Sequence, residues 1–178
     1  MSAVEPIRSK ADIERMKKSL HGRDLLLFTV GINSALRISD ILKLKVGDLR
    51  GKDYIAMKEK KTGKTKRFEI NKSIKKAIKE LVPADAKDDD WLFPSRKGGA
   101  ITRVQAYRIL NAASDRAGLK MEIGTHTMRK TFSYFAYRSG VDLAQLMTIL
   151  NHSSQRETLK YIGVTQEQTD DVYRAINL

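Results

Sequence analysis

The chain has 178 residues, enough for one folded domain, and no cysteine, which excludes disulfides, thiolate metal sites and thiol nucleophiles. No apolar run approaches the ~20 residues of a membrane span and the first residues lack the apolar core of a secretory signal, so we expect a cytoplasmic protein. The 34 Lys and Arg against 21 Asp and Glu give a net charge of +13, which favours nucleic acid as a partner over an anionic membrane or no anionic partner at all.

The first part of the chain predicts helices followed by a β-hairpin. Ser9 with Asp12 forms a capping box for a helix over roughly 10–20. The next segment is apolar nearly all round and predicts a buried helix, and a short helix follows it. Two strand-like segments then flank a Thr-Gly turn, which is typical of a hairpin. These segments cover residues 23–36, 37–44, 53–60 and 64–70.

The second part of the chain predicts further helices around one long loop. Apolar residues at helical spacing predict a helix that ends before Pro83, and the Pro-, Gly- and charge-rich stretch 83–100 predicts a loop. Helices are then expected over about 102–117, 126–138 and 142–150, with a short one ending near Tyr161 and a last one over about 166–176. The fold class predicted from these elements is mainly α with a small antiparallel β-sheet.

The stretch THTMRKTF, residues 125–132, combines a helix start with two cationic or hydrogen-bonding side chains. Thr125 is the expected N-cap, which puts His126 and Arg129 on one face of the first turn. Backbone N–H groups and the helix dipole favour an anion there. The buried stripe is expected on a neighbouring face, so that His126 and Arg129 flank it; its members are Met128, Phe132, Phe135 and Ala136.

Other polar residues that packing does not require occur in three more stretches, and each also has a purely structural interpretation. Arg37, with Asp40 one turn on, could be a surface ion pair. The lysine-rich turn around Lys61 could simply be solvated. Tyr161, nine residues after His152, could be a core aromatic. The patterns alone leave these alternatives open.

The combination of residue types points to chemistry on a phosphate without a metal ion. The acidic run 88–90 is typical of a solvated loop, and the three histidines are too scattered for a zinc site. Two arginines, two histidines, a lysine and a tyrosine match what metal-free phosphoryl transfer needs. Arginine binds phosphate oxygens bidentately, histidine donates a hydrogen bond or moves a proton, and tyrosine can act as a covalent nucleophile.

The order and spacing of these stretches resemble the catalytic domain of tyrosine recombinases, the phage-integrase family. SALRISDILKL resembles the family's first arginine box, THTMRKTF its H-x-x-R box, and LNHSSQRETLKYIG its final histidine-to-tyrosine box. The resemblance covers roughly residues 10–165, with a basic hairpin between the first two boxes. It implies a tyrosine recombinase catalytic-domain fold and a DNA strand-exchange reaction.

The resemblance also assigns roles to individual residues. It implies that Arg37 and Arg129 clamp the scissile phosphate, and that Tyr161 attacks phosphorus to form a 3′-phosphotyrosyl link. His126 and His152 would hydrogen-bond the phosphate oxygens or move protons. Lys61 would protonate the leaving 5′-oxygen, although Lys60, Lys64 and Lys66 lie within a small register error of it. Asp40 matches an acidic residue that supports the site.

Two positions depart from the family's usual pattern, and so does the length. Asn151 stands where a glycine commonly precedes the final histidine, and Lys130 replaces a common histidine. We expect both to be harmless, since Asn tolerates left-handed backbone. We also expect residues 1–178 to be a single catalytic domain with a short tail over 1–9, a C-terminal helix in 166–178 available for contact between protomers, and no N-terminal core-binding domain.

The expected function is that of a site-specific DNA recombinase or integrase that needs no cofactor and no metal. Its expected partners are double-stranded DNA and other protomers assembled on that DNA. Without DNA we expect a monomer, and the expected location is the cytoplasm, in association with the nucleoid. A relaxing type IB topoisomerase would share the fold and mechanism. A non-catalytic DNA-binding protein is the other alternative, because the stretch 139–154 could form a helix-turn-helix.

Overall fold

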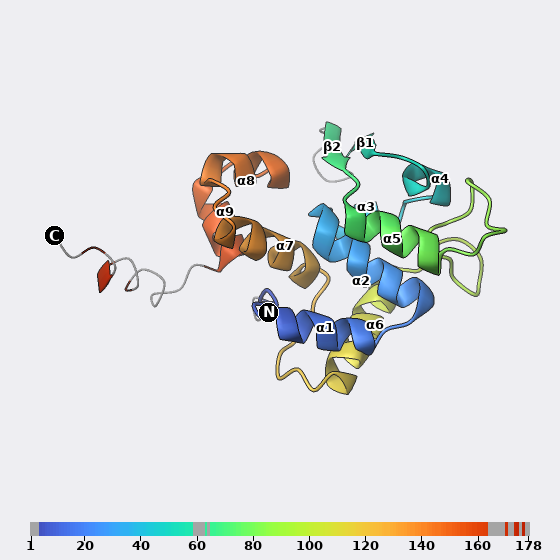
Figure 1. Ribbon diagram of the computed structural model, residues 1–178, viewed down its shortest axis with the longest axis horizontal. Coiled ribbons are helices and arrows are strands. Elements are labelled where there is room, and N and C mark those ends of the chain that lie inside the picture. The colour runs from blue at the N-terminus through green and yellow to red at the C-terminus, as the bar shows by residue number, and fades with distance from the viewer. Residues whose placement is uncertain are drawn as a thin grey trace.

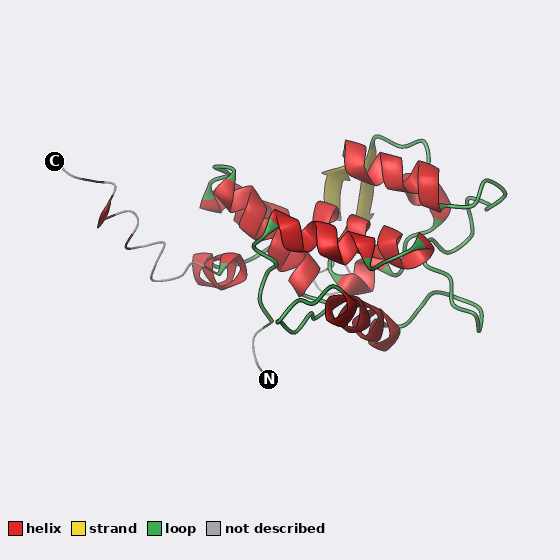
Figure 2. Cartoon of the chain, turned by 60° about the horizontal axis from the view of Figure 1, so that its bottom comes forward, coloured by secondary structure: helices red, strands yellow, loops and turns green. Residues whose placement is uncertain are grey.

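The computed structural model describes residues 4–58, 63, 65–163, 170, 173, 174 and 176. Those residues form helices and one two-stranded antiparallel sheet, which lies at the edge of the molecule in Figure 1, and this confirms the predicted fold class (Figures 1 and 2). The elements are α1 (Lys10–Lys18), α2 (Gly22–Ser34), α3 (Ile38–Ile41), α4 (Val46–Leu49), β1 (Tyr54–Lys58), β2 (Thr65–Glu69), α5 (Lys72–Leu81), α6 (Arg103–Arg116), α7 (Thr127–Arg138), α8 (Leu143–Leu150) and α9 (Gln155–Ile162). No helix among the described residues is both long and apolar enough to cross a membrane.

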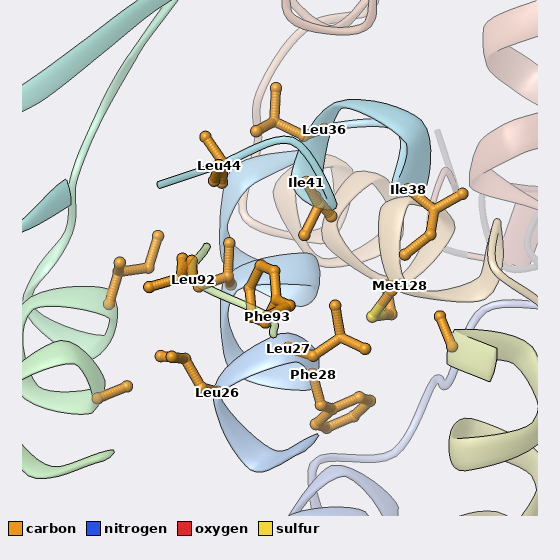
Figure 3. Packing of buried hydrophobic residues seen from close by; sticks show 14 of the residues in the cluster. Leu26, Leu27, Phe28, Leu36, Ile38, Ile41, Leu44, Leu92, Phe93 and Met128 are labelled. Carbon is orange, nitrogen blue, oxygen red and sulfur yellow. The ribbon is translucent and has the colours of Figure 1, made fainter. Parts of the chain in front are cut away.

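Helix α2 lies at the centre of the fold, as its all-round apolar sequence predicts (Figure 1). Leu27 and Phe28 are both 0% exposed, and burial of such a side chain contributes about 1.5–3 kcal/mol. Figure 3 shows these residues packed with Phe93 from the long loop and Met128 from α7. Helices α5 and α7 both pack on α2. Helix α2 therefore fixes the position of α7 and, at its own C-terminal end, of the segment that carries the next polar side chains.

The hairpin pairs β1 with β2 in an antiparallel register, with Ile55 opposite Phe68. Ile55 is buried and Phe68 packs against the same core, so this face of the hairpin is the apolar one. The turn expected between the strands includes Lys61, which lies outside the described residues. Most of the helix expected over 166–176 lies outside them as well.

Helix α7 differs from its prediction in which face it buries. The helix begins at Thr127 with His126 as its N-cap, instead of the expected Thr125. The core-facing residues Thr127, Arg129, Thr131 and Ser133 are polar and buried. The hydroxyls of the last two donate to backbone carbonyls four residues back, at 2.8 Å each, so they are satisfied without leaving the helix.

The apolar stripe predicted on α7 is therefore only partly buried. Met128 is in the core, whereas Phe132, Phe135 and Ala136 are half-buried and line a shallow groove with residues of α1 and α2. The prediction that this stripe, flanked by Arg129, is the buried face of the helix was wrong, because Arg129 itself faces the core. Its side chain is 1% exposed.

Helix α4 is a short element that the periodicity did not indicate. Four residues are too few to show a helical repeat, and the helix is fixed by its cap instead. The backbone N–H of Lys45 donates to the Asp48 carboxylate at 2.8 Å, which closes the first turn.

Candidate active site

Arg129 links the C-terminal ends of two helices from inside the protein. Its Nη1 donates to the carbonyl of Ala35, at the end of α2, at 2.7 Å, and its Nη2 donates to the carbonyl of Leu150, the last residue of α8. Helix C-termini carry partial negative charge, so a buried guanidinium is stabilised between them. The two segments that follow these carbonyls lead directly to Arg37 and His152.

The backbone turns sharply at both of these helix ends. Ala35 and Asn151 have φ of 53° and 50°, and they are the non-glycine residues with positive φ in the described part of the chain. Asn151 thus adopts the left-handed conformation that asparagine tolerates and that glycine would adopt freely. Such a turn ends a helix abruptly and redirects the chain, which is how both polar segments reach the N-terminal half of α7.

Arg37 and Asp40 lie on the short helix α3, directly after the α2 turn. Arg37 is the N-cap residue of α3 and is half-buried, and its positive charge acts on the phenol of Tyr161. The Asp40 backbone N–H donates to the Arg37 carbonyl at 2.9 Å, and the Asp40 side chain is fully buried. These facts disfavour the interpretation of the two residues as an exposed surface ion pair.

His152 is held in a fixed orientation between two partners. Its Nδ1 lies 3.0 Å from Thr158 Oγ1, and its Nε2 lies 3.6 Å from Glu157 Oε1. The ring is packed edge-on against the ring of Tyr161, with 4.7 Å between centroids. Because α9 begins just after His152, one turn of this helix supplies both partners and the next turn supplies the tyrosine.

Tyr161 places its hydroxyl 2.8 Å from His126 Nδ1, where either atom can act as donor depending on the tautomer. Its ring also lies below the Arg129 guanidinium, 5.8 Å from the Cζ atom to the centroid. Burial raises the pKa of the phenol above its usual value, and the charges of Arg129 and Arg37 partly offset that shift. The phenol is therefore protonated at neutral pH and surrounded by cations and histidines.

Two further side chains contact this cluster that the sequence analysis did not propose for the site, although it noted Lys130 as a departure from the family pattern. The Lys130 ammonium lies 5.5 Å from the Tyr161 ring centroid, and burial lowers the pKa of this lysine. Glu157 faces His152 and raises the pKa of Tyr161. Their positions were available as a signal: Lys130 follows His126 by one helical turn, and Glu157 precedes Tyr161 by one.

The structure thus brings together five of the six residues proposed for chemistry from the sequence, from positions 37, 126, 129, 152 and 161. The sixth, Lys61, is not among the described residues. Chemically, the cluster combines two arginine cations suited to a phosphate, a tyrosine hydroxyl suited to attack and a histidine in contact with that hydroxyl.

Comparison with known proteins matches residues 7–168 to the Phage integrase family. A relative in Bacillus subtilis (strain 168), described as "Probable integrase/recombinase YoeC", is 47% identical over 178 residues, covering 98% of this chain and 97% of the relative. "Tyrosine recombinase XerD" of Corynebacterium glutamicum is 27% identical over 157 residues, covering 85% of this chain but only 52% of the relative. The chain thus spans nearly all of the first relative and about half of the second.

The fold has a close counterpart among solved structures. The crystal structure of XerA recombinase superposes with a TM-score of 0.79 at 20% identity, covering 97% of this chain and 66% of the XerA chain. The likeness at this identity concerns the fold, which is the same mainly helical arrangement.

Proposed function

Because the chain belongs to the Phage integrase family, we propose that Tyr161 is the nucleophile of a DNA breaking and rejoining reaction and that Arg37 and Arg129 bind the phosphate under attack. The family's function is site-specific recombination, and this chain is a tyrosine recombinase catalytic domain. The observation that supports the assignment best is the 2.8 Å contact between the Tyr161 hydroxyl and His126 beside two arginine cations.

The two arginines are suited to different parts of phosphate binding. A phosphodiester carries one negative charge, and a second develops as a nucleophile adds to phosphorus. Arg129 is fixed by two helix-end carbonyls and cannot reorganise during the reaction, so its charge is preorganised for the transition state. Arg37 is half-buried at the start of α3 and supplies the second cation from the solvent side.

The attack requires that the phenol lose a proton, and His126 is placed to receive it. As the Tyr161 oxygen forms its bond to phosphorus, the proton passes to Nδ1 of His126 and the bond from phosphorus to the 5′-oxygen breaks. The 3′-phosphate is then bonded to Tyr161, and the 5′-oxygen takes a proton and leaves as a hydroxyl. Lys61 is our candidate donor of that proton, and His152 would hydrogen-bond a phosphate oxygen.

Double-stranded DNA is the substrate that fits both the site and the whole chain. A net charge of +13 favours contact with many phosphates, and the two arginine cations of the cluster are suited to bind one of them. We infer that the protein acts on DNA in the cytoplasm, at the nucleoid, and that protomers meet on the DNA. We also propose that residues 1–178 act as a single catalytic domain.

The alternatives weighed from the sequence are less well supported. A non-catalytic DNA-binding protein would have no need for a half-buried tyrosine whose hydroxyl contacts a histidine. A relaxing topoisomerase would use the same chemistry, but the relatives are described as an integrase/recombinase and a tyrosine recombinase.

The test is covalent trapping on a nicked duplex, from which the cleaved fragment diffuses away and leaves the protein attached to DNA. Tyr161→Phe should abolish the adduct and leave DNA binding unchanged, because only a hydroxyl is removed. Tyr137→Phe is the matched control, since Tyr137 is 38% exposed on α7. An adduct of wild-type yield with Tyr161→Phe would refute the assignment of the nucleophile.

A further inference from the structure

The segment Val4–Arg8, here called the N-terminal strap, crosses the two elements that carry the His126–Tyr161 contact. In Figure 1 the dark-blue segment that precedes α1 lies next to α7 and near the end of α9. Ile7 anchors the strap: its side chain is 0% exposed, and its backbone N–H donates to Thr131 Oγ1 of α7 at 2.9 Å. The middle of the strap is therefore packed into the core, whereas Glu5 and Arg8 are exposed.

One end of the strap packs on the residue that leads into α7. A Cβ added at Gly124 would lie 2.7 Å from Val4 Cγ1, so the absence of a side chain at Gly124 lets the strap approach. Gly124 does not have a positive φ, so its backbone conformation does not require glycine. It precedes His126 by two residues, which places this contact next to the proton acceptor.

The other end of the strap packs on the C-terminal end of α9. Arg8 Nη2 donates to the carbonyl of Gly163, the α9 C-cap, at 3.3 Å, and to Glu5 Oε2 at 2.9 Å. A Cβ added at Gly163 would lie 3.0 Å from Arg8 Nη2. A cation at a helix C-terminus is favourable to the helix dipole, so Arg8 stabilises the turn that directly follows Tyr161.

A third link runs through the side chain beside the Tyr161 ring. Glu5 acts electrostatically on Lys130, where its negative charge opposes the lowering of the lysine pKa by burial. The Lys130 ammonium lies 5.5 Å from the Tyr161 ring centroid. Glu5 thus favours the charged form of a group that packs on the nucleophile, while it also orients Arg8.

We propose that Arg8 is a positioning residue for the reaction: together with the strap, it holds α9 against α7 so that the Tyr161 hydroxyl remains in contact with His126. The inference rests on the proposed role of Tyr161 as nucleophile. Arg8 touches no reacting atom and acts through the end of the helix. The strap contacts Gly124 on one side and Gly163 on the other, so it spans the pair from outside the cluster.

The test compares Arg8→Ala and Arg8→Lys with the control Arg15→Ala. Arg15 matches Arg8 because each forms an ion pair with an acid three residues earlier, and the Arg8 and Arg15 side chains are 41% and 53% exposed. Two quantities are measured: hydrogen exchange of α9 amides in the free protein, and the single-turnover rate of adduct formation on a nicked duplex at saturating DNA. The DNA concentration at half-saturation is recorded as well.

We expect Arg8→Ala to speed α9 exchange about fivefold and to slow adduct formation at least threefold, as loss of a charge-assisted hydrogen bond at a helix end implies. In Arg8→Ala, the DNA concentration at half-saturation and the hydrogen exchange of α2 amides should not change. Arg15→Ala should behave like the wild type in every measurement, and Arg8→Lys should restore most of the rate of adduct formation. Unchanged α9 exchange, an unchanged rate or a loss confined to half-saturation would overturn the inference. A wild-type protein that forms no adduct would instead refute the proposed function itself.

Discussion

At the scale of single residues, one substitution tests both the structural role of Arg129 and the chemical role proposed for it. It satisfies two helix-end carbonyls and provides a fixed cation beside Tyr161. Arg129→Ala should slow adduct formation at least ~10²-fold, in line with the loss of one preorganised donor, and lower the free energy of unfolding by about 2–4 kcal/mol. Single-turnover cleavage and urea unfolding measure the two effects. Arg138→Ala, exposed in the last turn of α7, is the control.

The phenol of Tyr161 provides a second test at this scale. Because burial raises its pKa, the folded protein keeps this proton to higher pH than an unfolded chain does. The contribution of this phenol to the free energy of unfolding is therefore lost as the pH rises above about 10. When the near-ultraviolet titration curve of Tyr161→Phe is subtracted from that of the wild type, the difference should show one tyrosine that ionises at higher pH than free tyrosine. A difference curve centred at or below the usual value would contradict the burial.

At the scale of elements, the sharp ends of α2 and α8 decide where the polar residues meet. Asn151 ends α8 in the left-handed conformation, which costs most residues about 1–2 kcal/mol and glycine very little. Asn151→Ala should therefore lower the free energy of unfolding by about 1 kcal/mol, and Asn151→Gly should leave it unchanged or raise it. Chemical denaturation compares the two variants. Equal stability of both would mean that the turn is unstrained.

The elements also show how far sequence reasoning could reach. Periodicity located α5 and α8, because each repeats its apolar residues over two turns, and a sequence that is apolar nearly all round located α2. It could not show the burial of Arg129, because the carbonyl that its Nη1 meets lies 94 residues away. The boxes gave the candidate site residues by resemblance, whereas the contacts of Lys130 and Glu157 with the cluster became apparent only when α7 and α9 were seen packed together. The N-terminal strap, expected to be a tail, has no periodic signal and depends on the two glycines that it covers.

At the scale of the whole molecule, the net charge predicts how the chain binds DNA. A net charge of +13 predicts binding mainly through phosphates, so affinity should fall steeply with salt and differ little between specific and random duplexes. We expect the free protein to sediment as a monomer. Titrations at two salt concentrations and sedimentation without DNA measure both. Salt-resistant, site-selective binding or a stable dimer without DNA would contradict this expectation.

The most direct test of the account is to identify the amino acid that becomes linked to DNA. The adduct on a nicked duplex is formed in the presence of EDTA, digested with trypsin and nuclease, and sequenced by mass spectrometry. The tryptic peptide of residues 161–174 contains both Tyr161 and Tyr173, so it carries its own control, since Tyr173 is 78% exposed. We predict a 3′-phosphate bonded to Tyr161 and an unmodified Tyr173. A nucleotide on Tyr173 or another residue, or an adduct that forms only when a divalent metal ion is present, would contradict the account.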